Sequence, residues 1–143
     1  MNDFHLNTGK AGWEIFQEEM KKLWERPMRK IIVAGSRDFI YREFLFSELD
    51  KLIKEPCIIL CGEAKGADTY GKQWALSRNH DVASFPANWD KHGKAAGMIR
   101  NQEMIDDADE LIAFWDGVSR GTADVVRRAE KKGIPITIIN YTL

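Results

Sequence analysis

The chain has 143 residues, a length that suits one domain with a buried core of its own. Its 21 basic and 22 acidic residues leave a net charge of −1, and 44% of its residues are hydrophobic, as is usual for a globular protein. A general nucleic-acid binder usually carries a basic surplus, so this balance argues against nucleic acid as a partner. The sequence has no signal peptide, transit peptide or apolar run of about 18 residues, so we expect a cytoplasmic protein that does not enter a membrane.

The first predicted element is an amphipathic helix over residues 11–25. Its apolar side chains recur at spacings of three and four and are Trp13, Phe16, Met20, Leu23 and Trp24. Residues 1–10 are polar and small, and we expect them to be loosely held. The apolar stripe has to be buried against the rest of the chain or against a second copy, which predicts a homo-oligomer. We treat residues 1–28 as an extension and residues 29–143 as the domain proper.

Beyond this helix, short apolar runs alternate with segments of helical periodicity. The apolar runs, each expected to form a strand, are Lys30–Gly35, Cys57–Cys61, Asp81–Phe85, Glu110–Phe114 and Pro135–Ile139. The helical segments between them are residues 40–54, 67–79, 93–106 and 122–132. This alternation predicts an α/β fold, a Rossmann-like three-layer α/β/α domain with a five-stranded parallel sheet of order 3-2-1-4-5.

The two cysteines, Cys57 and Cys61, lie four residues apart in the second predicted strand. At about 3.3 Å per residue their side chains stand roughly 13 Å apart, which is too far for a disulfide. A second pair of zinc ligands is also missing. We therefore expect core thiols and no metal site, although a Mg²⁺ ion bound together with a phosphate is compatible with the sequence.

Glycine and polar side chains follow each of the first four predicted strands, whereas the connections at the opposite ends are plain turns. In a parallel sheet these four loops share one edge, which is where such folds bind ligands. The candidate ligand-binding residues on these loops and on the third helix of the domain are Gly35, Ser36, Arg37, Gly62, Lys65, Gly66, Asp68, Trp89, His92, Gly97, Arg100, Asn101, Trp115, Ser119, Arg120, Gly121 and Thr122.

The fourth loop, residues 119–122, opens a helix directly after a strand. Backbone N–H groups at such a position attract anions, and Gly121 lets a phosphate approach the backbone closely. Ser119 and Thr122 offer hydroxyl groups, and Arg120 adds charge. The structural alternative is an ordinary helix cap.

The other candidates also have structural alternatives. Lys65 reaches a phosphate or is solvated, and Asp68 accepts from a sugar hydroxyl or caps a helix. His92 is either a general acid–base residue or a surface histidine. Trp89 and Trp115 stack on a base or pack against the protein.

Two familiar nucleotide motifs are missing from these loops. The second loop has glycines at 62 and 66 but lacks the Gly-Lys-Ser/Thr of a P-loop, and it departs from Gly-x-Gly-x-x-Gly. An ordinary P-loop ATPase or dinucleotide-dependent dehydrogenase is therefore not expected.

Taken together in order, the four loops resemble a known family. The matching residues are Gly35-Ser36-Arg37-Asp38-Phe39, Gly62-x3-Gly66-Ala67-Asp68, Phe85-Pro86-Ala87-x-Trp89-Asp90-x-His92-Gly93-x-Ala95-Ala96-Gly97-x-x-Arg100-Asn101-x-x-Met104 and Ser119-Arg120-Gly121-Thr122. Over about residues 30–139 the chain resembles the YspA-type branch of the YpsA-related SLOG family. The resemblance implies a Rossmann-like sheet that binds nucleotides or nucleotide-derived ligands, in a superfamily that includes DprA and the "lonely guy" phosphoribohydrolases.

The resemblance extends unevenly to the phosphoribohydrolases. Their Arg-x-x-x-Met element is similar to Arg100–Met104, but the glutamate of their Gly-Thr-x-x-Glu element is replaced here by Val125. Valine cannot serve as a general acid–base, so hydrolysis requires another carboxylate, such as Asp124, Asp68 or Glu63.

Three functional hypotheses follow. The first is a protein that binds a nucleotide-like ligand as a sensor, sequestering or processing protein. The second is a nucleotide hydrolase that cleaves an N-glycosidic or phosphate-ester bond, with Arg100, Asp124 and Glu63 as candidate catalytic residues. The third is a DNA-linked or protein-interaction module built on the helix over residues 11–25.

Overall fold

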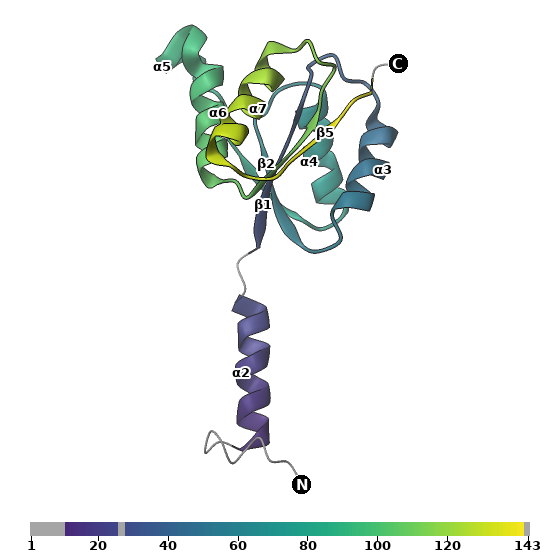
Figure 1. The fold of residues 1–143 in the computed structure, drawn as a ribbon, viewed down its shortest axis with the longest axis vertical. Helices are drawn as coiled ribbons and strands as arrows, with labels where there is room; N and C mark the ends of the chain where they lie inside the picture. Colours follow the sequence, from purple (N-terminus) through teal and green to yellow (C-terminus); the bar gives the residue numbers. More distant parts are fainter. Residues whose placement is uncertain (1–10, 26–27, 142–143) are drawn as a thin grey trace.

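The computed structural model describes residues 11–25 and 28–141, with the side chains of residues 22–25 left aside. The expectation for residues 1–10 lies outside this part of the chain. From residue 29 onward the described chain folds into alternating strands and helices (Figure 1). The strands are β1 (Arg29–Gly35), β2 (Cys57–Cys61), β3 (Asp81–Ser84), β4 (Glu110–Phe114) and β5 (Ile136–Ile139). The helices are α2 (Gly12–Glu25), α3 (Arg42–Leu52), α4 (Ala67–Ser77), α5 (Trp89–His92), α6 (Ala96–Asp107) and α7 (Arg120–Lys132), with a 3₁₀ turn η1 (Gly93–Ala95).

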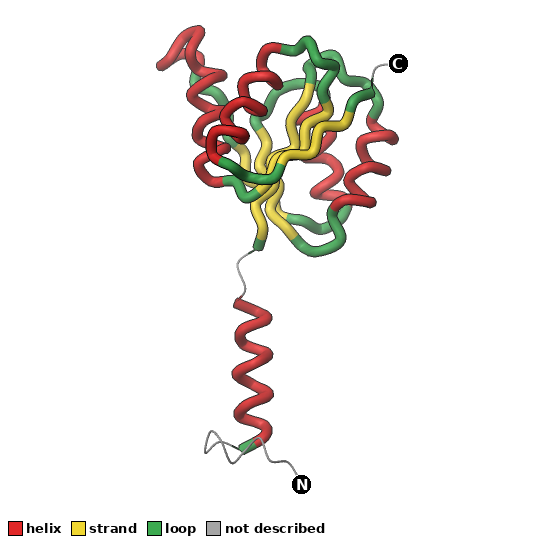
Figure 2. Tube along the Cα trace, viewed as in Figure 1, coloured by secondary structure: helices red, strands yellow, loops and turns green. Residues whose placement is uncertain are grey.

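The five strands form one parallel sheet in the order β3-β2-β1-β4-β5, which confirms the predicted fold and strand order. β1 lies at the centre, with Ile32 beside Leu60 of β2 on one side and Leu111 of β4 on the other. Helices cover both faces of the sheet (Figure 2). All strands end at the same edge of the sheet, because every pair of neighbouring strands is parallel. From β1 the chain adds β2 and β3 on one side, and it then crosses to the other side of β1 to add β4 and β5. This change of side leaves a crevice at the ends of β1 and β4.

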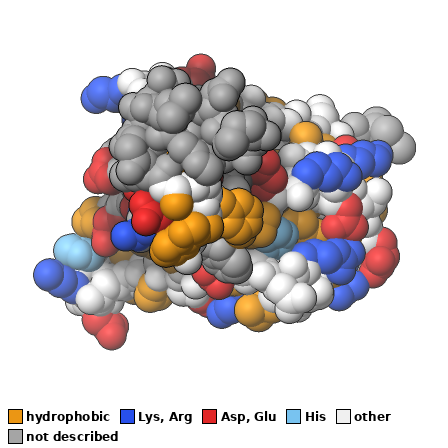
Figure 3. Space-filling view, turned by 90° about the horizontal axis from the view of Figure 1, so that it is seen from below, with side chains coloured by type: hydrophobic (Ala, Val, Ile, Leu, Met, Phe, Trp, Pro, Cys, Tyr) orange, Lys and Arg blue, Asp and Glu red, His pale blue; other side chains and the backbone are white. Residues whose placement is uncertain are grey.

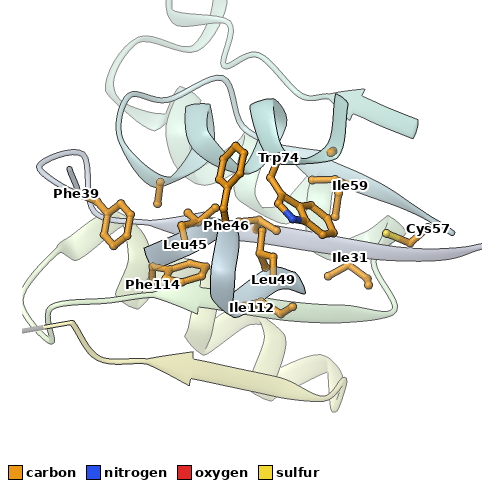
Figure 4. Close-up of a cluster of buried hydrophobic side chains, with 13 residues drawn as sticks. Ile31, Phe39, Leu45, Phe46, Leu49, Cys57, Ile59, Trp74, Ile112 and Phe114 are labelled. Carbon is orange, nitrogen blue, oxygen red and sulfur yellow. The ribbon is translucent and has the colours of Figure 1, made fainter. Parts of the chain in front are cut away.

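Alternate side chains of each strand supply two cores. On one face Ile31, Ile59 and Phe114 pack against α3 and α4, with Leu45, Leu49 and Trp74 filling the layer (Figure 4). On the other face Ile32, Leu60 and Leu111 pack against Met104 of α6 and Val125 of α7. Burial on both faces explains why the strands are almost entirely apolar in sequence. Cys57 and Cys61 are buried free thiols, as predicted.

The predicted helix over residues 93–106 begins differently in the structure. A short helix, α5, starts at Trp89 and is capped by the side chain of Asn88, which accepts from the backbone N–H of Lys91 at 3.1 Å. Gly93 then takes φ +56°, a left-handed conformation that interrupts the helix, and α6 begins only at Ala96. The sequence prediction began this helix at Gly93 and was therefore wrong about residues 89–92, which it left in the preceding loop.

Helix α2 confirms the predicted N-terminal helix but does not pack as expected. Figure 1 shows it extending away from the sheet, at the end opposite to the edge where the strands finish. Trp13 and Phe16 are 62% and 64% exposed, and hydrophobic side chains are visible near the centre of the view from below (Figure 3). The expectation that this stripe is buried against the rest of the chain is therefore wrong for these two residues. Burial against a second copy stays a prediction.

Candidate functional site

A cavity of about 410 Å³ lies at the crevice between the ends of β1 and β4. We call this cavity the cleft; its lining residues are Ala34, Gly35, Ser36, Arg37, Asp38, Ala64, Asp68, Arg100, Asn101, Met104, Asp116, Val118, Ser119, Gly121, Thr122 and Val125. Most of the candidate residues from the first and fourth loops are thus brought together, along with Arg100 and Asn101 from α6. The cleft joins loops that are about 80 residues apart in sequence, because β1 and β4 are neighbours in the sheet.

The start of α7 supplies unsatisfied backbone donors to one wall of the cleft. Asp116 Oδ1 accepts from the backbone N–H groups of Val118 and Ser119, both at 2.8 Å, which shapes the loop before the helix. These bonds lower the pKa of Asp116. The Ser119 side chain does not cap the helix; its Oγ instead accepts from Thr122 Oγ1 at 3.2 Å. The N–H groups of the first helical turn, around Gly121, therefore lack intrahelical partners.

The hydroxyl of Ser36 is the second unsatisfied group at the cleft. Ser36 is 2% exposed, and within the part of the chain that the structure describes its Oγ makes no hydrogen bond of good geometry, although it lies near enough to Asp116 to help lower that pKa. Its backbone is fixed, because its N–H donates to Phe114 O at 3.3 Å and its C=O accepts from Phe39 N at 3.1 Å. A buried hydroxyl without a partner is costly, and a ligand atom in the cleft would satisfy it.

Arg100 closes the cleft from α6. Its Nη1 donates to Gly62 O and its Nε donates to Asn101 Oδ1 at 2.9 Å, so the guanidinium is held in one place. Gly62 has no room for a side chain here, because a Cβ would lie 2.7 Å from Arg100 Nη1. The second loop thus serves chiefly to position Arg100.

Asp68 lies in the cleft wall with an altered acidity. It is 6% exposed, and burial raises its pKa to about 6 although the nearby charge of Arg100 opposes the shift. Backbone hydrogen bonds from Ala64, Gly62 and Gly35 also oppose it. Asp68 therefore changes its protonation near neutral pH, in contact with the ligand cavity.

This acidity predicts a specific pH dependence of stability. The folded protein holds the Asp68 proton up to about pH 6, whereas the unfolded chain releases it near pH 4. Between these values the folded state binds more protons, so the free energy of unfolding falls as the pH rises, by about 3 kcal/mol in total from this group. In urea titrations from pH 4 to 7.5, Asp68→Asn should gain stability relative to the parent as the pH rises. The same change at the exposed Asp90 is the control, and parallel curves for Asp68→Asn and the parent would contradict the assignment.

Asp124 and Glu63, the candidate catalytic carboxylates, are not among the residues that line the cleft. Asp124 is buried and accepts from Asn101 Nδ2 at 3.0 Å, Arg127 Nη2 at 2.8 Å and Arg128 Nε at 2.9 Å, so it ties α7 to α6. Burial raises its pKa, but these partners outweigh burial and lower it. Glu63 is partly exposed and pairs with Lys72 at 3.2 Å. Val125, one residue after Asp124, is the residue that faces the cleft.

Four other predicted residues lie outside the cleft and outside the two cavities next to it. Trp115 Nε1 donates to Ser119 O at 3.1 Å, so this tryptophan braces the fourth loop. Gly66 has φ +76°, and a Cβ there would lie 2.4 Å from Ser36 O, so it allows the first two loops to pack closely. Lys65 is exposed and His92 is half-buried, and neither lines these cavities.

Four predicted residues line a groove beside the cleft rather than the cleft itself. Trp89, Gly97, Arg120 and Asp124 belong to this adjoining cavity of about 500 Å³. Sequence reasoning omitted Asp38, Asp116 and Val125 from the site. Asp116 could have been found from the sequence, because it follows β4 within the fourth loop. For Val125 the only sequence signal was its position in the Gly-Thr-x-x-Glu element of the phosphoribohydrolases.

Among the described residues, none of the helices combines the length and the apolar character that a membrane span requires. In the same part of the chain, no group of three or more His, Cys, Asp or Glu side chains could hold a metal ion.

The fold and the cleft define a Rossmann-like protein whose site lies at the switch point of the sheet. Residues 29–92 match the model of the YspA, cpYpsA-related SLOG family, and the chain is 36% identical over 123 residues to the Gene 61 protein of Mycobacterium phage D29, covering 80% of this chain and 97% of that protein. The chain belongs to this SLOG family.

Solved structures share the fold at low sequence identity. The DNA processing protein A (DprA) from Streptococcus pneumoniae superposes with a TM-score of 0.68 at 19% identity, covering 81% of this chain and 52% of that one. The structural genomics target TM1055 superposes with a TM-score of 0.62 at 17% identity, covering 76% and 72%. The chain thus spans about half the length of the DprA chain, and the likeness concerns the fold.

Proposed function

We propose that this protein binds a nucleotide or nucleotide-derived ligand in the cleft, through a phosphate group. The carrying observation is that two kinds of unsatisfied donor, the Ser36 hydroxyl and the N–H groups at the start of α7, line one cavity. Arg100 adds a fixed positive charge to the same space. Anions are the ligands that such a combination stabilises best.

The polar and apolar parts of the cleft suit the rest of a nucleotide. Asp68 and Asn101 offer groups that hydrogen-bond a sugar, and Met104 and Val125 give an apolar floor. Membership in the SLOG family supports the same class of ligand. We also propose that the protein is located in the cytoplasm.

Calorimetry with matched compounds tests this function. We expect a nucleoside 5′-monophosphate to bind at least about 10-fold more tightly than the nucleoside without phosphate, because charge-assisted bonds to the phosphate are lost. Ser36→Ala should weaken the monophosphate about 5-fold, yet leave the free energy of unfolding unchanged or raise it, because no good hydrogen bond is lost in the free protein and an unsatisfied buried hydroxyl is removed. Lys65→Ala, which removes a nearby charge outside the cleft, is the control. Equal affinities for nucleoside and monophosphate would contradict phosphate recognition.

Hydrolysis of the bound nucleotide is the second candidate function, and Asp68 favours it. A carboxyl group with a pKa near 6, beside the ligand cavity, has the acidity that general acid–base catalysis requires. Release of free base from nucleoside monophosphates by the pure protein, abolished in Asp68→Asn, would support this activity. If no free base is released at high protein concentration, the protein binds nucleotides without hydrolysing them.

We also propose that α2 mediates self-association. Its Trp13 and Phe16 are exposed, and the helix extends from the end of the domain opposite to the cleft (Figure 1). Deletion of residues 1–28 should convert an oligomer into a monomer in light scattering while ligand affinity changes by less than about 2-fold. A full-length chain that is already monomeric at micromolar concentration would refute this role.

A further inference from the structure

A groove adjoins the cleft and is continuous with it. The groove, a cavity of about 500 Å³, shares Arg37, Arg100, Asn101 and Gly121 with the cleft. Gly121 lines both spaces, and a Cβ at this position would meet no atom within 4 Å. A ligand bound over the start of α7 can therefore extend from the cleft into the groove.

The groove contains arginine side chains that form no hydrogen bond or ion pair with the described part of the chain. The other arginine side chains that the structure describes all take part in a hydrogen bond or an ion pair; they are Arg29, Arg42, Arg78, Arg100, Arg127 and Arg128. Arg37 and Arg120 make no such interaction with the described part of the chain. They come from the loops after β1 and β4, and both line the groove.

An aromatic and an apolar side chain complete the groove wall. Trp89 of α5 is 51% exposed and Met98 of α6 is 49% exposed. Trp89 packs over Gly97, where a Cβ would lie 3.5 Å from the indole ring. An exposed indole beside two free guanidinium groups favours a planar ring attached to an anion.

We propose that the groove binds a second phosphoryl group, so that the ligand is a nucleotide with a diphosphate group. This inference rests on the proposed function, since the first phosphate lies at Ser36 and the start of α7. Arg37 and Arg120 contact the second phosphate, and Trp89 lies beside the group that is attached to that phosphate. The separate assignment of the two phosphates makes Arg120, which lines the groove but not the cleft, a specificity-determining residue.

Calorimetry with AMP, ADP, GMP and GDP, at fixed ionic strength and without divalent cations, tests this inference. The full chain should bind each diphosphate about 10-fold more tightly than the corresponding monophosphate. Arg120→Ala should remove this preference and leave monophosphate affinity within about 2-fold, whereas Lys65→Ala should keep the preference.

Four outcomes would overturn the inference. Equal affinities for mono- and diphosphates in the parent would show that the groove takes no second phosphate, while the proposed function would stand. Equal weakening of both compounds by Arg120→Ala would show a general electrostatic effect. Tighter binding of a 5′-phosphorylated dinucleotide than of ADP would assign the groove to the backbone of an oligonucleotide. Failure of all four mononucleotides to bind would overturn both this inference and the proposed function.

Discussion

Replacing Gly121 with leucine is expected to abolish nucleotide binding while the domain stays folded. Gly121 lines both the cleft and the groove, and a side chain built there would project into open space rather than into the protein. Leucine would fill the volume over the α7 backbone that the phosphate is proposed to occupy. We expect a loss of affinity of at least about 100-fold, or roughly 3 kcal/mol.

The stability of this variant separates occlusion from unfolding. Leucine has a higher helix propensity than glycine, so the free energy of unfolding should be unchanged or raised by up to about 1 kcal/mol. Glu130→Leu, an exposed position near the other end of α7, is the matched control and should bind like the parent. Normal ligand affinity in Gly121→Leu would place the ligand elsewhere.

Replacing Gly35 with alanine should have the opposite signature, a large loss of stability. Gly35 ends β1, and a Cβ there would lie 2.4 Å from Phe114 O of the neighbouring strand and 2.6 Å from Ala67 Cβ of α4. Both neighbours are backbone or buried and have no room to move, so the strand and the helix would have to separate. We expect the free energy of unfolding to fall by about 3 kcal/mol.

Urea denaturation of the purified variants measures this effect. Gly97→Ala, where a Cβ would make ordinary contacts at 3.5 Å and beyond, is the control and should be neutral or stabilising. A Gly35→Ala variant as stable as the parent would show that β1 separates readily from β4 and α4 at this position, contrary to the close contacts around Gly35.

The fold was predictable because its pattern is simple and repeated. Strands buried on both faces read as short apolar runs, and the helices between them carry a clear period, so strand order and both cores followed from general rules. The short helix α5 and the break after it were missed because the predicted helix began at Gly93; only the structure shows the positive φ of this glycine.

The site was predictable to the level of loops but not of side chains. Parallel topology alone places the loops after β1 and β4 together, which is why Ser36 and Gly121 were among the candidates. Sequence spacing does not reveal that Trp115 turns back to brace its own loop, nor that Asp124 points to Asn101 rather than into the cleft. The orientation of Trp115 depends on the conformation of its loop, and that of Asp124 depends on packing between α6 and α7; the local sequence encodes neither.

The most direct test of the account is an amide NMR titration of the full chain with a nucleoside 5′-monophosphate. If the phosphate lies over the start of α7, the amide signals of Gly121 and Thr122 should show the largest shifts, together with that of Ser36, because their N–H groups or neighbouring hydroxyls face the cleft. Amides at the opposite edge of the sheet, such as that of Lys54, should not move. Saturable shifts confined to other surfaces, or no shift at all across the panel of bases, would contradict the proposed nucleotide site.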